Sequence, residues 1–99
     1  MRQVVWSKEA RDDYFEILHY IAEDDPDAAE RVVRAIRKTD DGLANFATGH
    51  PGRVAGTYEK SVLRLPYIVV YSFSEDGAAL IFLRVIHTAR HWAPDDWPA

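Results

Sequence analysis

Residues 66–92 read PYIVVYSFSEDGAALIFLRVIHTARHW, and this stretch limits the possible folds more than any other part of the chain. It is typical of two apolar β-strands joined by a tight turn, because the pair Asp76-Gly77 accepts the positive φ that short hairpin loops need. The returning strand, residues 80–87, is apolar on both faces apart from Arg84, as in strands that lie inside a sheet. A chain of 99 residues is short for covering both faces, so we expect it to leave apolar surface for a partner polypeptide.

The remaining sequence predicts two helices and two further strands. Residues 3–6 (QVVW) and residues 57–63 (TYEKSVL) have the short, partly alternating pattern of strands. Ser7 fits an N-cap, and apolar residues then recur at helical spacing until Asp25-Pro26 ends one helix and starts another, whose buried side extends to Phe46. The predicted order is β-α-α-β-β-β. This is an α+β fold in which a helical hairpin covers one face of a mostly antiparallel sheet.

We expect residues 1–99 to form a single domain, with residues 93–99 as a short irregular tail because of their two prolines. The chain has no cysteine, its four histidines lack ligand spacing, and no glycine-rich phosphate loop is present. We therefore predict no metal and no cofactor. There is no signal peptide, and the longest apolar runs are far shorter than the ~20 residues of a membrane span, which favours a cytoplasmic protein without membrane contact.

Several motifs occur in a characteristic order along the chain. They are Tyr20-Ile21-Ala22 ahead of Pro26, the pair Gly52-Arg53, residues 66–71 (PYIVVY) and residues 85–92 (VIHTARHW). Together with the element order, they make nearly the whole chain resemble the ParE/RelE superfamily of type II toxins. The resemblance implies a small toxin that a cognate antitoxin neutralises by wrapping its C-terminal segment over it. Such a partner would cover the excess apolar surface.

The branch of the superfamily depends on a few strand residues. RelE-type members cleave mRNA in the ribosomal A site with cationic residues, because attack on phosphorus builds up negative charge. Laid against that pattern, the two strand lysines fall on Glu59 and Ser61, and an arginine falls on Ile68. A carboxylate at a phosphate contact reverses the sign of the interaction. The resemblance therefore implies a ParE-like toxin that inhibits DNA gyrase by binding rather than by catalysis and is neutralised by a ParD-like antitoxin, with growth arrest and plasmid stabilisation as its effects.

The net charge of −4 and the lack of a basic run argue against direct binding to nucleic acid. Two alternatives stay open. One is a RelE-type, ribosome-dependent mRNA endonuclease whose cationic set is rebuilt from Arg53, Arg84, His87 and Arg90. The other is a non-toxic relic that only binds an antitoxin.

Candidate functional residues lie around the strand predicted at residues 57–63 and at the end of the last strand. They are Arg53, Glu59, Arg84, His87, Arg90 and Trp92. His87, together with the arginines, suits contact with a phosphate or an acidic surface. The simpler interpretation is structural: His87 closes the sheet edge, and Glu59 pairs with an arginine such as Arg53, Arg64 or Arg90.

The residues predicted to contact the antitoxin are apolar or aromatic. They are Tyr14, Ile17, Leu18, Ile21, Val32, Ile36, Tyr67 and Tyr71. The two strand tyrosines also have an interpretation as core residues, since aromatic side chains on strands are more often buried. Trp92 and Trp97 either fix the tail to the domain or belong to a binding surface.

Overall fold

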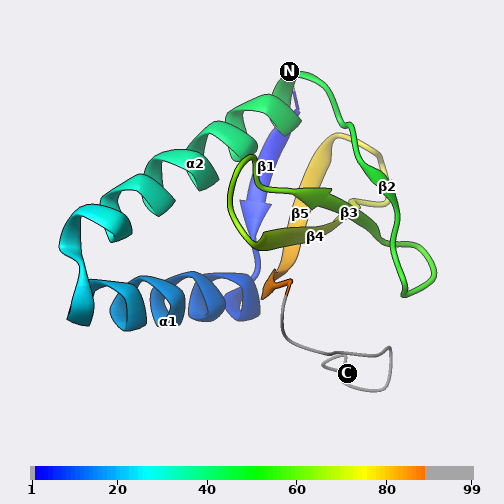
Figure 1. The fold of residues 1–99 in the computed structure, drawn as a ribbon. Coiled ribbons are helices and arrows are strands. Elements are labelled where there is room, and N and C mark those ends of the chain that lie inside the picture. The colour runs from blue at the N-terminus through cyan, green and yellow to red at the C-terminus, as the bar shows by residue number, and fades with distance from the viewer. Residues whose placement is uncertain (1, 89–99) are drawn as a thin grey trace.

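The structure, a computed structural model, describes residues 2–88 and has the predicted α+β arrangement (Figure 1). The elements are β1 (Gln3–Trp6), α1 (Lys8–Asp24), α2 (Pro26–Asn45), β2 (His50–Pro51), β3 (Tyr58–Ser61), β4 (Tyr67–Phe73) and β5 (Ala79–His87). The two-residue strand β2 precedes the strand predicted at residues 57–63, in a stretch where we predicted no strand. Residues 89–99, with Arg90, Trp92 and the predicted tail, lie outside the described residues. Within the described part, no helix is long and apolar enough to cross a membrane.

Both helices begin where the sequence predicts. The Ser7 hydroxyl accepts a hydrogen bond from the Ala10 N–H at 3.0 Å, and the Asp25 carboxylate accepts one from the Ala28 N–H at 3.1 Å. Asp25 also ends α1, because its own N–H donates to the Ile21 carbonyl at 2.9 Å. One residue therefore caps both helices. The connection between the helices is Asp25 alone, and it lies away from the sheet (Figure 1).

The sheet has the strand order β1-β5-β4-β3-β2, with β1 parallel to β5 and the other pairs antiparallel. The apolar strand β5 lies between β1 and β4, as predicted. However, β1 pairs with β5 only as far as Phe82, so the rest of that edge of β5 has no neighbouring strand. Helix α1 lies against it, and Asp13 accepts a hydrogen bond from the Val85 N–H at 3.0 Å (Figure 1). A side chain thus takes the place of the missing strand.

Alternation along β4 separates two apolar clusters. The main core lies between the helices and one sheet face and contains Val69 and Tyr71, whereas Val70 packs with Ile86 and Val54 in a smaller cluster. The buried hairpin side chains Val69, Val70, Leu80 and Phe82 are 0% exposed. Ile68, Ile81 and Leu83 stay partly exposed, whereas the centre of this hairpin is covered within the chain. One reason is that Val54, from the loop before β3, packs against the second cluster.

Exposed apolar surface lies elsewhere. The large exposed apolar side chains of the described residues are Val5, Phe15, Tyr20, Phe46 and Leu63. We predicted Phe46 to lie on the buried side of the second helix, but its side chain is 77% exposed. Helix α2 ends at Asn45, and Phe46 is its C-cap with extended backbone angles, so its side chain no longer follows the helical pattern.

Candidate partner-binding groove

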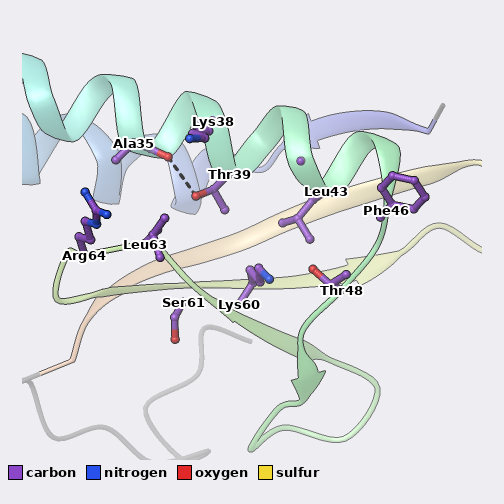
Figure 2. A pocket seen from close by; sticks show the side chains of 11 residues that line it. Ala35, Lys38, Thr39, Leu43, Phe46, Thr48, Lys60, Ser61, Leu63 and Arg64 are labelled. Carbon is purple, nitrogen blue, oxygen red and sulfur yellow. Dashed lines mark hydrogen bonds between the residues drawn. The ribbon is translucent and has the colours of Figure 1, made fainter.

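A groove of about 640 Å³ lies between α2 and the segment from β3 to the following turn (Figure 2). We call it the inner groove and define it by Lys38, Leu43, Phe46, Lys60, Leu63 and Arg64. Leu43 is buried and belongs to the core, whereas Phe46 and Leu63 are 77% and 69% exposed. Exposed apolar side chains that gather along one groove mark an interaction surface more often than isolated ones do.

Small residues of α2 line this groove, so the helix backbone lies close to its floor. Ala35 and Gly42 line it, and a Cβ at Gly42 would have nothing within 4 Å. The Thr39 hydroxyl donates to the Ala35 carbonyl at 3.0 Å, so this polar group is already satisfied within the helix (Figure 2). The groove therefore offers an apolar helical surface without an unpaired hydroxyl, which suits the apolar side of an incoming segment.

The opposite wall is a turn that the backbone holds in a particular shape. The Val62 N–H donates to the Tyr67 carbonyl at 2.9 Å, and the Leu65 N–H donates to the Val62 carbonyl at 3.2 Å. Arg64 has a φ of 65°, which is uncommon outside glycine and costs on the order of 1 kcal/mol. The turn directs Leu63 and Arg64 toward α2 (Figure 2).

The charge of the inner groove is opposite to that of the chain. Lys38, Lys60 and Arg64 line it, and none of its described lining residues carries a carboxylate. In residues 2–88, no ion pair involves any of these three cations. With a net charge of −4 for the whole chain, this is a local cationic site. An acidic segment with an apolar side complements it.

Glu59 and Arg53 hold the loop before β3. Glu59 is 3% exposed, its carboxylate accepts the Arg53 backbone N–H at 3.0 Å, and it lies 3.8 Å from Arg53 Nε. This confirms the predicted ion pair with Arg53 as the partner. The structure explains the glycine of the Gly52-Arg53 motif, because a Cβ at Gly52 would lie only 2.4 Å from the Thr57 hydroxyl oxygen.

The positions at which we looked for RelE-type cations lie together. Ser61 pairs with Ile68, and Glu59 is two residues before Ser61 on the same side of β3. Glu59, Ser61 and Ile68 therefore provide a buried carboxylate, a hydroxyl and an alkyl chain at the positions where RelE-type toxins have cations. Lys60, between them, points to the opposite side and lines the inner groove.

Arg84 is bound to Asp13. Its Nε and one terminal nitrogen donate to the two carboxylate oxygens at 2.7 and 3.0 Å. This hydrogen bonding raises the pKa of the Arg84 guanidinium, against a smaller lowering by burial. His87 packs edge-on against Tyr67, with ring centroids 5.3 Å apart. The described members of the candidate set are therefore engaged in contacts within the chain.

The residues that we predicted to contact an antitoxin all pack against the core between the helices and the sheet. Val32, Ile36, Tyr67 and Tyr71 are buried, while Tyr14, Ile17, Leu18 and Ile21 are half-buried against the same core. Burial raises the pKa of both strand tyrosines, and the Tyr71 hydroxyl donates to the Thr48 carbonyl. The core interpretation of the two tyrosines is confirmed. Sequence reasoning missed Lys38, Lys60, Leu63 and Arg64. The available signal was Arg64 between Leu63 and Leu65, because a cation between two apolar residues is a pattern that can indicate a binding surface.

Solved structures with the same fold define the class. The chain superposes on a protein of the chromosomal ParDE system of P. aeruginosa with a TM-score of 0.76, at 24% identity, over 88% of this chain and 96% of that one. For the complex RelBE2 of Mycobacterium tuberculosis the TM-score is 0.61, at 23% identity, over 87% and 96% of the chains. For a YoeB/ParE toxin of Agrobacterium tumefaciens it is 0.61, at 20% identity, over 91% and 99%. The fold is that of the small ParE- and RelE-type toxins.

Sequence comparison narrows the class. The family model described as ParE toxin of the type II toxin–antitoxin system parDE matches residues 4–92. The chain is 39% identical to Y4kP of Sinorhizobium fredii over 92 residues, which are 92% of this chain and 93% of that protein. It is 35% identical to toxin RelE2 of Caulobacter vibrioides over 91 residues, or 91% and 99% of the two chains. The chain belongs to the ParE toxin family of type II toxin–antitoxin systems.

Proposed function

We propose that this toxin arrests growth in the cytoplasm by binding DNA gyrase, and that a ParD-like antitoxin neutralises it through the inner groove. The observation that carries the antitoxin part is the composition of the groove, which joins two exposed apolar side chains to three cations without a lining carboxylate. The occupant that fits is an acidic, amphipathic segment. The solved ParDE and RelBE2 systems support this part, because toxins of this fold occur there with antitoxins.

The proposed mode of action is binding rather than catalysis. The positions Glu59, Ser61 and Ile68 carry no positive charge, and Arg53 and Arg84 lie beside the carboxylates of Glu59 and Asp13. General acid–base cleavage of RNA needs a positioned acid and base, and stabilisation of the transition state needs cations that face the phosphate. The described residues of the candidate set provide neither a paired acid and base nor arginines without a neighbouring carboxylate. The family membership supports gyrase as the target.

The antitoxin part is tested by removing the apolar side chains of the groove. Fully burying a side chain of this size stabilises a complex by about 1.5–3 kcal/mol, and Phe46 and Leu63 are mostly exposed in the free chain. The double substitution Phe46→Ala, Leu63→Ala should therefore weaken antitoxin binding by at least about 100-fold. Val5→Ala, which trims an exposed apolar residue outside the groove, is the matched control.

The measurement is titration calorimetry with the cognate ParD-like antitoxin. Binding that is equally tight for the double variant and for Val5→Ala would contradict the proposed groove. For the target, the purified toxin is added in parallel to a gyrase supercoiling assay and to a translation reaction. Inhibition of supercoiling with intact mRNA is the expected result. Cleavage of ribosome-bound mRNA would refute binding to gyrase as the mode of action.

An mRNA endonuclease is the second candidate, favoured by the 35% identity to toxin RelE2 of Caulobacter vibrioides. It predicts that Arg90→Ala abolishes RNA cleavage and leaves antitoxin binding intact. A relic without toxicity is the third, and it predicts normal growth when the wild-type chain is expressed alone.

A further inference from the structure

A second surface with the composition of a protein-binding site lies on the outer side of the helical hairpin. A cleft of about 300 Å³ is formed between α1 and α2, and its lining shares no residue with the inner groove. We call it the outer cleft and define it by Trp6, Arg11, Tyr14, Phe15, Arg37 and Asp40. At 3.6 residues per turn, Arg37 and Asp40 lie about 140° and about 160° around α2 from Gly42 of the inner groove.

An aromatic row leads from the core to this cleft. The Trp6 ring centroid lies 4.8 Å from that of buried Phe82 and 5.4 Å from that of Tyr14, and Tyr14 lies 5.5 Å from Phe15. Phe15 is 63% exposed. The Trp6 indole N–H donates to the Asp40 carboxylate at 2.9 Å, which further fixes the row. Because the rings behind Phe15 already restrain it, this exposed aromatic side chain loses little conformational freedom on binding.

Two arginines flank the exposed ring. Arg11 lies one helical turn before Phe15 on α1, and Arg37 faces the cleft from α2. Within residues 2–88, no ion pair engages either arginine. Asp40, the carboxylate among the described lining residues, accepts the Trp6 N–H. Tryptophan, tyrosine and arginine are the residue types that dominate the binding energy of protein interfaces.

We propose that the outer cleft is the surface with which this toxin binds its cellular target, and that the target presents an acidic protein patch with an apolar socket for Phe15. The inference rests on the proposed function in one respect, which is that the chain acts on a target at all. A protein patch fits better than a nucleic acid, because two arginines on a chain of net charge −4 make no extended basic surface for a phosphate backbone.

The test separates target binding from antitoxin binding. The cleft variant is Arg11→Glu, Arg37→Glu. The control, Arg31→Glu, Arg34→Glu, makes the same change of charge at two exposed positions of α2 outside both surfaces. Each protein is expressed without antitoxin in a bacterial host, and surviving colonies are counted. Titration with the antitoxin and thermal unfolding of each purified complex show that the fold and the inner groove are intact.

The expected result is that the cleft variant no longer arrests growth while the control arrests it like the wild type, with antitoxin affinity unchanged in both. If gyrase is the target, the cleft variant should bind it about 30-fold more weakly, as for a hot-spot loss. Growth arrest by the cleft variant would overturn the inference, and so would loss of arrest in both variants. Tight binding of duplex DNA or RNA that depends on Arg11 and Arg37 would also overturn it.

Failure of the proposed function would give a different experimental result from failure of this inference. A wild-type toxin that arrests growth without inhibiting supercoiling removes gyrase as the target, and the colony counts still decide the role of the outer cleft. Phe15→Ser provides an independent variant without a change of charge. It should reduce growth arrest and leave the melting temperature within a few degrees of the wild type, because the ring is mostly exposed.

Discussion

Replacing Asp13 with alanine removes the group that closes the open edge of β5. The Asp13 carboxylate accepts the Val85 N–H at 3.0 Å and binds the Arg84 guanidinium at 2.7 and 3.0 Å. An unsatisfied backbone N–H costs about 1–3 kcal/mol. The Arg84 side chain is 25% exposed, so we count its lost ion pair at only about 1 kcal/mol. The expected loss in the free energy of unfolding is about 3 kcal/mol, or about 15 °C in melting temperature for a chain of this length.

The assay is thermal and urea unfolding followed by circular dichroism. Asp12→Ala is the matched control, because Asp12 is the neighbouring residue on α1 and makes only an exposed pair with Lys8 at 3.0 Å. It should change the free energy of unfolding by less than about 1 kcal/mol. Asp13→Asn, which keeps one acceptor oxygen, should fall between the two. If Asp13→Ala and Asp12→Ala destabilise the chain equally, the role assigned to Asp13 is refuted.

Two further predictions concern pH. Burial raises the pKa of Tyr71, so the unfolded chain loses this proton first. Stability should be complete below pH ~10 and fall as pH rises through the folded-state pKa, an alkaline loss that Tyr71→Phe should reduce in urea unfolding at pH 9–11.5. Hydrogen bonds from the Ser74 hydroxyl and then the Ala78 N–H lower the pKa of Asp76. Its stabilising effect should be present above pH ~4 and decrease as pH falls below it, so that Asp76→Asn destabilises the chain more at pH 7 than at pH 2. An equal effect at both pH values would contradict this.

The fold was largely predictable because its determinants are local. Ser7, Asp25 and Pro26 mark the helix ends by short-range hydrogen bonds, and Gly77 has the positive φ of 72° that the Asp-Gly pair predicts. The alternation of residues 67–71 between the two faces of β4 is a local pattern as well. These features need no knowledge of distant residues, so a pattern along the chain is sufficient to find them.

The candidate surfaces were not predictable because they depend on distant residues and on small backbone details. Asp13 and Arg84 are 71 positions apart, and their pairing follows only from where β1 stops. Phe46 is exposed because α2 ends one residue before it. The position of Arg64 in the inner groove depends on its left-handed backbone conformation. An arginine in the sequence does not predict that conformation, which is uncommon outside glycine.

Strand β3 is only four residues long and serves two unrelated tasks on its two sides. Glu59 anchors the preceding loop on one side, and Lys60 lines the inner groove on the other. Because neighbouring strand residues face opposite ways, an insertion or deletion here would exchange the two side chains and ruin both tasks. Divergence among related toxin–antitoxin pairs in one genome should therefore proceed by point substitution at the position of Lys60, and cognate pairs can become insulated from one another without any change at Glu59.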